Sequence, residues 1–232
     1  MSNLLVVESE NDKFFIDALI RHLNLENIEV SDSSICDIDD YECLSGLSST
    51  KLVTVLNAVK FRVKKEDIQN IGILIDIDNK TITERLTLIN DSVQNVFETQ
   101  ETLTAQNIFI AVAVDEFQSV QIATYFTNAA GKGELETLLK AIKSESSIHA
   151  DCLDSWQECL QANNIREGQG LKPKDFDKFW VQMYIRYDTC TKKESTQAGR
   201  KCNNEAAMNK PIWNFDHEYL SGLKTFLTLF AA

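Results

Sequence analysis

The sequence is poor in the residues that interrupt regular structure, and it lacks long apolar runs. Only two prolines and eight glycines occur among 232 residues, so we expect no flexible linker, and the parts of the chain should pack as one body. No apolar run approaches the roughly 20 residues that a membrane-spanning helix needs. The N-terminal segment also lacks the basic region of a signal peptide. These absences predict a cytoplasmic protein with no membrane partner.

Cysteine and histidine are present, but without the spacing of a metal site. The six cysteines form no C-x-x-C pair, and the three histidines do not complete a zinc set. In the cytoplasm the cysteines are expected to be reduced. Cys152 and Cys159 are seven residues apart, so on a helix they share one face, where we interpret them as small core residues.

Basic residues are also scarce, with 23 lysines and arginines against 35 acids and a formal charge of −12. This balance disfavours broad adhesion to phosphate backbones and leaves room only for a local basic patch. An acidic chain can still act on nucleic acid through divalent cations, because these reverse the local sign of charge. The hydrophobic content of 44% is enough for a substantial core, which predicts a folded globular protein.

What the sequence does contain is an alternation of buried strands and amphipathic helices. Continuous aliphatic runs typical of parallel strands occur in "NLLVVES" and "NIGILIDID", and "ENIEVSDS" is a further candidate. Two more strands are predicted in "NIFIAVAVDE" and "SVQIATYFTN", the second as a possible antiparallel partner of the first. Between these strands, the spacing of apolar residues predicts three helices. The first begins near Asn11, which is its expected N-cap, the second runs from about Ser49 to Arg62, and the third follows "DIDN".

From Gly133 onward the pattern changes to helices only. We therefore predict an α/β fold with a mostly parallel central sheet flanked by helices, formed by residues 1–145. Residues 146–232 are predicted to be a helical extension packed on this domain.

Acidic residues follow two of the predicted strands. Glu8 ends the first strand, and Asp76 and Asp78 end the strand that begins near Asn70. Ligands of open parallel sheets collect beyond the carboxyl ends of the strands. Asp12 lies one helical turn past Glu8 and can return toward the same strand tip. Four carboxylates that converge would repel one another unless cations lie between them, and oxygen ligands suit Mg²⁺ or Mn²⁺.

Four motifs in order carry a resemblance to a known family. They are "VESENDKFF" from residue 7, "DIDN" from residue 76, "GELE" at 133–136 and "DHEYLSGLKTFL" at 216–227. The first two resemble the signature of the Toprim superfamily, a strand that ends in Glu and a second that ends in D-x-D-N. Together the four are similar to small stand-alone bacterial Toprim proteins related to the OLD-type nucleases. The resemblance spans nearly the whole chain, and the motifs are more specific together than singly.

The resemblance implies a Toprim-like, Rossmann-like fold and roles for five acids. Glu8 resembles the Toprim glutamate, which acts as metal ligand or general acid/base, and Asp76 and Asp78 resemble the D-x-D metal ligands. These three are the predicted catalytic residues. Asp12 resembles the second acid of the OLD-type site, and Glu136 the acid of the G-x-L-E element. All five are predicted metal ligands for Mg²⁺ or Mn²⁺.

The implied activity is metal-dependent phosphodiester hydrolysis on DNA or RNA, in a bacterial or phage-defence setting and with a possible partner ATPase. The oligomeric state stays open. Ser9 stands where the family has glycine, so the loop beside the metal could be altered. A transition-state cation is also expected, with Lys132, Lys178 and Arg186 as candidates.

Each acid also has a structural alternative. The four acids of the first two motifs could be helix caps or solvated loop residues, with Asp78 and Asn79 where an N-cap belongs. Glu136 could serve only the dipole of its helix.

Other features also allow two interpretations. The tyrosines at 184, 187 and 219 could in principle be nucleophiles, but their helical spacing favours core or surface roles. The run "CTKKESTQAGRKC" could contact nucleic-acid phosphates or be a mobile solvated loop. The alternative function is an inactive Toprim-like module that binds nucleic acid or a protein, with its acids splayed or paired with Lys or Arg.

Overall fold

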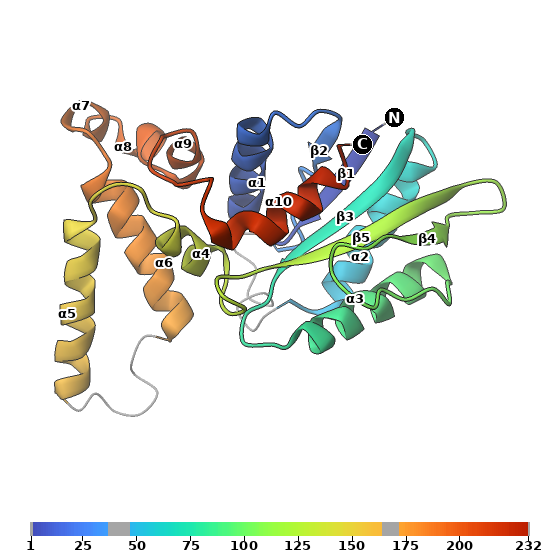
Figure 1. The fold of residues 1–232 in the computed structure, drawn as a ribbon, viewed down its shortest axis with the longest axis horizontal. Helices are drawn as coiled ribbons and strands as arrows, with labels where there is room; N and C mark the ends of the chain where they lie inside the picture. The colour runs from blue at the N-terminus through green and yellow to red at the C-terminus, as the bar shows by residue number, and fades with distance from the viewer. Residues whose placement is uncertain (1, 37–46, 164–171, 232) are drawn as a thin grey trace. The chain divides into compact units, whose positions relative to one another are not determined.

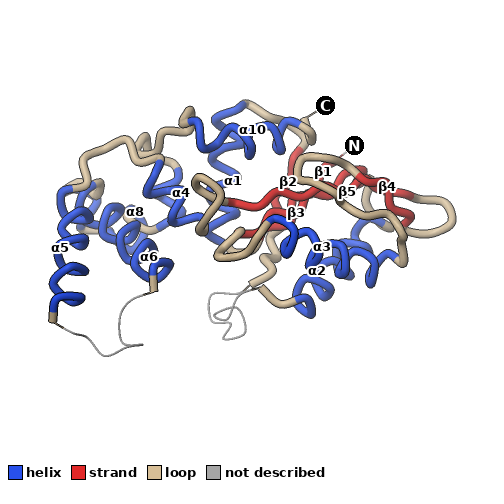
Figure 2. The backbone as a smooth tube through the Cα atoms, turned by 60° about the horizontal axis from the view of Figure 1, so that its bottom comes forward, coloured by secondary structure: helices blue, strands red, loops and turns tan. Residues whose placement is uncertain are grey.

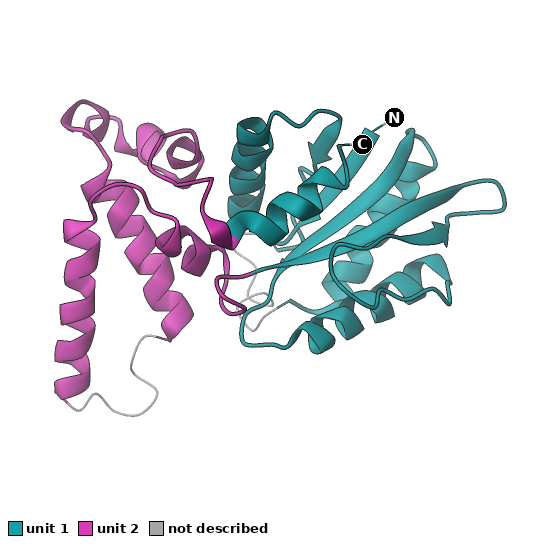
Figure 3. Ribbon diagram, viewed as in Figure 1, with its two compact units in different colours: residues 1–127, 220–232 teal, residues 128–219 magenta. Residues whose placement is uncertain are grey.

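The computed structural model describes residues 2–36, 47–163 and 172–231. The chain forms two compact units, coloured separately in Figure 3: residues 1–127 with 220–232, and residues 128–219. The C-terminal helix therefore belongs to the first unit. The predicted division near residue 145, and the packing of the extension on the first domain, remain predictions.

The first unit is built on a five-stranded sheet with the order β2-β1-β3-β5-β4 (Figure 1). The strands are β1 (Ser2–Val7), β2 (Ile28–Val30), β3 (Ile68–Asp76), β4 (Ile110–Ala113) and β5 (Ser119–Thr127). All neighbours pair in parallel except β4, which runs antiparallel to β5. The predicted α/β class, the mostly parallel sheet and the antiparallel last pair are confirmed.

Helices cover both faces of this sheet (Figures 1 and 2). On one face lie α2 (Ser49–Val63) and α3 (Ile82–Phe97), and on the other lie α1 (Glu10–Leu23) and α10 (Ser221–Thr228). Side chains of a strand alternate between the faces, so Leu4 and Val6 of β1 pack in the core with α2 and α3. Burial of both faces explains why the strand sequences are continuous aliphatic runs.

Gly72 of β3 lets the C-terminal segment return to the sheet. A Cβ atom at this position would lie 2.4 Å from Leu5 Cδ2 and 2.9 Å from Phe230 Cζ. The ring of Phe230 packs against Phe226 with centroids 5.1 Å apart, and both side chains are fully buried. The end of the chain is thus part of the core that supports β1 and β3, the two strands that carry the candidate site.

The second unit is helical, as predicted for the C-terminal region. Its elements are α4 (Leu135–Ala141), α5 (Ile148–Ala162), α6 (Pro173–Met183), the π-helical turn η2 (Tyr184–Asp188), α7 (Lys192–Ser195), α8 (Ala198–Lys201) and α9 (Asn204–Met208). A 3₁₀ turn, η3 (Glu218–Leu220), precedes α10. The run "CTKKESTQAGRKC" is mostly exposed, as the solvated alternative predicts, but it forms the short helices α7 and α8 rather than a loop. Within the described ranges, no helix is both long and apolar enough to cross a bilayer.

The cysteines differ from the prediction in two ways. Cys190 and Cys202 form a disulfide, and Cys36 is also disulfide-bonded, so the prediction of reduced cysteines is wrong for these three; Cys43 lies outside the described residues. Cys152 and Cys159 are exposed rather than in the core. They do share one face of α5, but the opposite stripe with Ala150 and Leu153 is the buried one.

Candidate metal centre

The ends of β1 and β3 bring two distant acids together. The strands are parallel neighbours, with Val7 opposite Leu74, so Glu8 leaves β1 beside the last residues of β3. The Glu8 carboxylate accepts a hydrogen bond from the Asp76 backbone N–H, with 2.9 Å between Oε2 and N. Asp76 itself is buried, with 7% of its surface exposed. The segments around residues 8 and 76 therefore meet at the carboxyl edge of the sheet.

Asp12 is held at the start of α1 by a capping box. Ser9 is the N-cap, and its backbone N–H donates to Asp12 Oδ2 at 2.9 Å, while its hydroxyl oxygen accepts from the Asp12 N–H at 3.3 Å. The prediction of Asn11 as N-cap is wrong by two residues. Asp12 is 6% exposed, so it is a capping residue, as the structural alternative proposed, and also a buried acid beside Glu8.

Ser9 occupies the position where a glycine was expected. Its backbone is extended, with φ −136° and ψ 168°, a conformation that any residue adopts. A positive φ, which would favour glycine, is absent at Ser9. The serine is therefore compatible with this loop, and it adds the cap that begins α1.

Asp78 lies in the turn after β3 and pairs with a buried arginine. Its backbone is left-handed, with φ 55°, and its carboxylate forms an ion pair with the Arg85 guanidinium. Arg85 also donates from Nε to the carbonyl oxygen of Ile77 at 3.4 Å. Neither Asp78 nor its neighbour Asn79 caps the following helix, because the N-cap of α3 is Thr81. The ion pair with Arg85 thus holds the Asp78 carboxylate where its charge acts on Glu8.

Glu8 has a strongly perturbed acidity. Its pKa is raised from 4.5 to about 7, first by burial and then by the negative charges of Asp12 and Asp78. The hydrogen bond from Asp76 and the charge of Arg85 act in the opposite direction but are outweighed. Glu8 therefore behaves as a carboxyl group whose ionised form is penalised in the absence of a cation.

Arg85 is the basic residue at this edge of the sheet that sequence reasoning missed. Its side chain is only 5% exposed, and it lies on α3 in the same buried stripe as Ile89 and Val93. A charged residue within an otherwise apolar stripe is the signal that could have identified it, because buried arginine needs an acidic partner.

The remaining predicted residues lie in the second unit. Glu136 is in the first turn of α4, where it suits the helix dipole, and its role as a fifth ligand stays a prediction. Gly133 of the same motif has φ 87°, and a Cβ there would lie 2.4 Å from Thr137 Oγ1, so this position requires glycine.

The three predicted transition-state cations also belong to the second unit. Lys178 forms an ion pair with Glu134 at 3.2 Å, Arg186 is exposed in η2, and Lys132 lies in the turn with Ala129. Their role at the acidic cluster stays a prediction.

The tyrosines of this region have the core and surface environments that their spacing favoured. Tyr184 is buried and its hydroxyl donates to the Ile212 carbonyl oxygen at 2.9 Å. Tyr187 and Tyr219 are exposed.

The chemistry of the donor set at the sheet edge fits a divalent cation. The Glu8 carboxyl is close enough to the Asp12 and Asp78 carboxylates and to the Arg85 guanidinium for all three charges to act on it, and Asp76 contacts it through the backbone N–H. Oxygen donors are the ligands of Mg²⁺ and Mn²⁺. The raised pKa of Glu8 is the electrostatic cost that such a cation would remove.

Comparison with known proteins gives one match. Residues 2–231 match the family described as "Protein of unknown function (DUF3226)". No curated protein matches the chain significantly. No solved structure does so either.

Proposed function

The chain belongs to the DUF3226 family, and for this member we propose a metal-dependent phosphodiester hydrolase that acts on DNA or RNA, with Mg²⁺ or Mn²⁺ as cofactor. We further propose that its α/β unit is Toprim-like. The observation that carries the proposal is the contact of Glu8 with the Asp76 backbone, because it joins the acids of two sequence motifs at one sheet edge. The negative charges of Asp12 and Asp78 act on Glu8, and such like-charged groups favour a bound cation.

In this proposal the acids divide the work. The bound ion would supply Lewis-acid polarisation of a phosphate and a lowered pKa for water. Asp12 and Asp76, both buried, would hold the ion. Glu8, with a metal-free pKa of about 7, is suited to accept a proton from water near neutral pH.

Arg85 and Asp78 complete the arrangement on the α3 side. The guanidinium orients Asp78 through their ion pair and places a fixed positive charge beside the cluster. Planar guanidinium groups suit phosphate oxygens, so Arg85 replaces Lys132, Lys178 and Arg186 as our candidate for the cation that stabilises negative charge in the transition state.

One observation favours a second candidate function. A binding module without catalysis would have its acids paired with Lys or Arg, and the Asp78–Arg85 ion pair fits that description. In that case the acidic edge would be an interaction surface for nucleic acid or a protein. Glu8, Asp12 and Asp76 distinguish the two candidates, because a module would need no cation at these three acids.

Cleavage assays test the proposal directly. The full chain is incubated with plasmid, single-stranded DNA and total RNA, each with Mg²⁺, Mn²⁺ or chelator. We expect cleavage of at least one substrate with metal only, and its loss in Glu8→Ala. Glu10→Ala is the matched control, because Glu10 is an exposed acid one residue into α1. Metal-independent cleavage, or equal activity of Glu8→Ala and wild type, would refute the assignment.

The wider setting is also a proposal. We propose nucleic acid as the partner in a bacterial cytoplasm, and an ATPase partner as for the OLD-type relatives. If wild type is inactive alone but binds Mn²⁺ through the four acids, adding such an ATPase becomes the next arm of the assay.

A further inference from the structure

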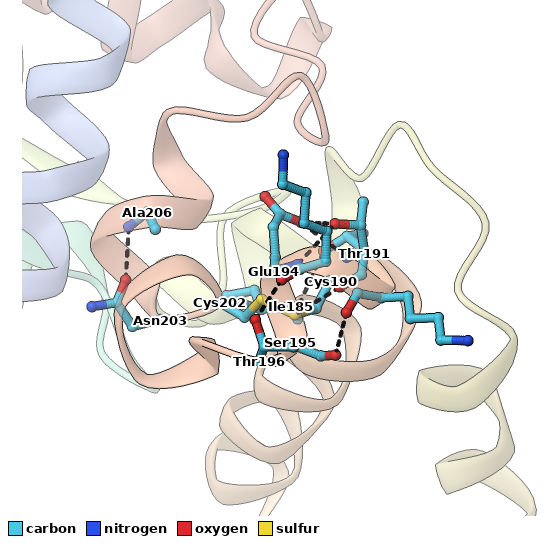
Figure 4. Close-up of a disulfide and its surroundings, with 12 residues drawn as sticks. Ile185, Cys190, Thr191, Glu194, Ser195, Thr196, Cys202, Asn203 and Ala206 are labelled. Atoms are coloured by element: carbon cyan, nitrogen blue, oxygen red, sulfur yellow. Dashed lines mark hydrogen bonds between the residues drawn. A yellow bond between two sulfur atoms is a disulfide. The ribbon is translucent and has the colours of Figure 1, made fainter.

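Three potential metal ligands gather in the second unit, far along the chain from the acidic motifs. The sulfur atoms of Cys190 and Cys202 and a carboxylate oxygen of Glu194 all lie within 4.8 Å of one another. Figure 4 shows the disulfide next to Glu194, whose carboxylate is hydrogen-bonded to Thr191. The spacing C-x₃-E-x₇-C is not a familiar zinc pattern, which is why the sequence did not indicate it.

Short helices fix the three side chains. Cys190 precedes Thr191, the N-cap of α7, and Cys202 ends α8. Glu194 closes a capping box: its Oε2 accepts the Thr191 N–H at 2.9 Å and the Thr191 hydroxyl at 2.8 Å. Lys210 contacts the other oxygen, Oε1, at 2.9 Å. An ionised carboxylate accepts about four hydrogen bonds, so Glu194 keeps capacity for a further partner.

The cysteine pair is compatible with two chemical forms. Its Cα atoms are 5.7 Å apart, which suits the disulfide that the structure contains. Two thiolates bound to one tetrahedral zinc lie roughly 3.8 Å apart, given Zn–S bonds of about 2.3 Å. The sulfurs are bonded to each other in this structure, so they reach that separation only after the S–S bond is broken. Disulfides of cytoplasmic proteins are typically transient or redox-sensing, so the reduced form matters for the cytoplasmic setting proposed above.

We propose that Cys190, Glu194 and Cys202 form a redox-gated zinc site. In the oxidised protein the sulfurs are bonded to each other and bind no metal. A dithiol reductant of the thioredoxin class transfers two electrons and two protons, which breaks the S–S bond and oxidises the reductant to its own disulfide. Zn²⁺ then binds both sulfurs with release of the two thiol protons, Glu194 is the third ligand, and water completes the tetrahedron.

Ligand chemistry selects the metal. Two thiolates and one carboxylate favour zinc over Mg²⁺ or Mn²⁺, which prefer oxygen alone. Cys202 is 1% exposed and Cys190 is half-buried, so the pair is shielded while one sulfur stays reachable for the reductant. Lys210 places a positive charge beside the Glu194 carboxylate and should therefore weaken zinc binding. Removal of this charge is one of the tests below. This site does not depend on the proposed hydrolase activity.

Zinc binding to the two redox forms tests the proposal. The full chain is prepared in two forms, one oxidised and one reduced with a dithiol that is afterwards removed under anaerobic conditions. Each form is titrated with Zn²⁺ in competition with a chromophoric chelator. We expect the reduced form to bind one more equivalent per chain than the oxidised form. Zinc held by the carboxylates of the first unit binds both forms equally, so only the difference between the forms counts. Because reduction also opens the disulfide of Cys36, every titration uses a Cys36→Ser background, and failure here leaves the proposed hydrolase untouched.

Matched variants locate the extra zinc. Cys190→Ser should abolish it, Glu194→Gln should weaken it at least tenfold while keeping the capping box, and Lys210→Met should tighten it. Cys152→Ser/Cys159→Ser is the control and should retain it, since these thiols are exposed on α5. With Co²⁺, a thiolate charge-transfer band should appear only in the reduced protein. Equal zinc binding by both forms, or extra zinc that survives Cys190→Ser, would overturn the proposal and leave a structural disulfide.

Discussion

Glu8→Gln should stabilise the metal-free protein at the expense of its metal site. The Glu8 carboxyl has a folded-state pKa of about 7 against 4.5 ordinarily. A group whose pKa is raised by folding favours the folded state in its protonated form. Its contribution is therefore complete below pH 4.5, is lost as the pH rises toward 7, and stays lost above pH 7. Glutamine is neutral at every pH, so the variant avoids this loss.

The size of the effect follows from the shift. A difference of about 2.5 pKa units corresponds to about 3 kcal/mol at 1.36 kcal/mol per unit. The amide oxygen of glutamine can still accept the Asp76 N–H that now bonds to Glu8, so the hydrogen bond itself is retained. For a chain of this length, about 3 kcal/mol raises the melting temperature by about 6–12 °C.

The assay is urea denaturation in chelator at pH 8 and at pH 4.5, for wild type and Glu8→Gln. We expect the variant to be more stable at pH 8 and equal to wild type at pH 4.5. Adding Mg²⁺ at pH 8 should then stabilise wild type but not the variant, because a ligand that binds only the folded form stabilises it. A variant that is no more stable than wild type at pH 8, or equally more stable at both pH values, would refute the electrostatic reasoning.

Three further substitutions test the surroundings of the site by the same denaturation measurement. Arg85→Ala leaves Asp78 without its buried partner and should cost about 3 kcal/mol without metal, with part of the loss recovered by Mg²⁺; full stability without metal would show that the ion pair contributes nothing. Gly72→Ala forces a methyl group into the side chains of β1 and α10 and should cost about 1–3 kcal/mol, whereas Gly199→Ala, which meets nothing within 4 Å, should cost nothing; equal effects would contradict the packing described. Ser9→Ala removes the N-cap of α1 and should cost about 1 kcal/mol, while Ser9→Gly should cost only a few tenths; a larger loss in the glycine variant would argue against a capping role.

Hydrophobic periodicity predicted the elements of the first unit because the faces that are buried in the structure are the ones that carry apolar residues in the sequence. The runs that became β1 and β3 are covered on both faces, so every position is apolar and the strands are unmistakable. Their acids could be placed at one sheet edge because parallel neighbours end on the same side. Which strands are neighbours was not in the pattern, and the pairing of β1 with β3 came only from the structure.

Other features depend on contacts that no pattern encodes. Arg85 meets Asp78 because the turn after β3 folds back onto α3, a geometry set by the left-handed backbone of Asp78. The Cys190–Cys202 disulfide joins two short helices that lack a periodic signal. Cys152 and Cys159 share one face of α5, as their spacing predicts, but this face is exposed and not in the core. The spacing could not show this, because α5 carries two apolar stripes and only one of them is buried.

The proposed function requires that the acids at the ends of β1 and β3 bind a divalent cation. Titration of the full chain with Mn²⁺, following the electron paramagnetic resonance signal of the free ion, measures this directly. We predict that wild type and Glu10→Gln bind Mn²⁺ equally, and that Asp76→Asn loses at least one ion per chain while staying folded. Undiminished binding by folded Asp76→Asn, or no binding by wild type, would contradict the claim.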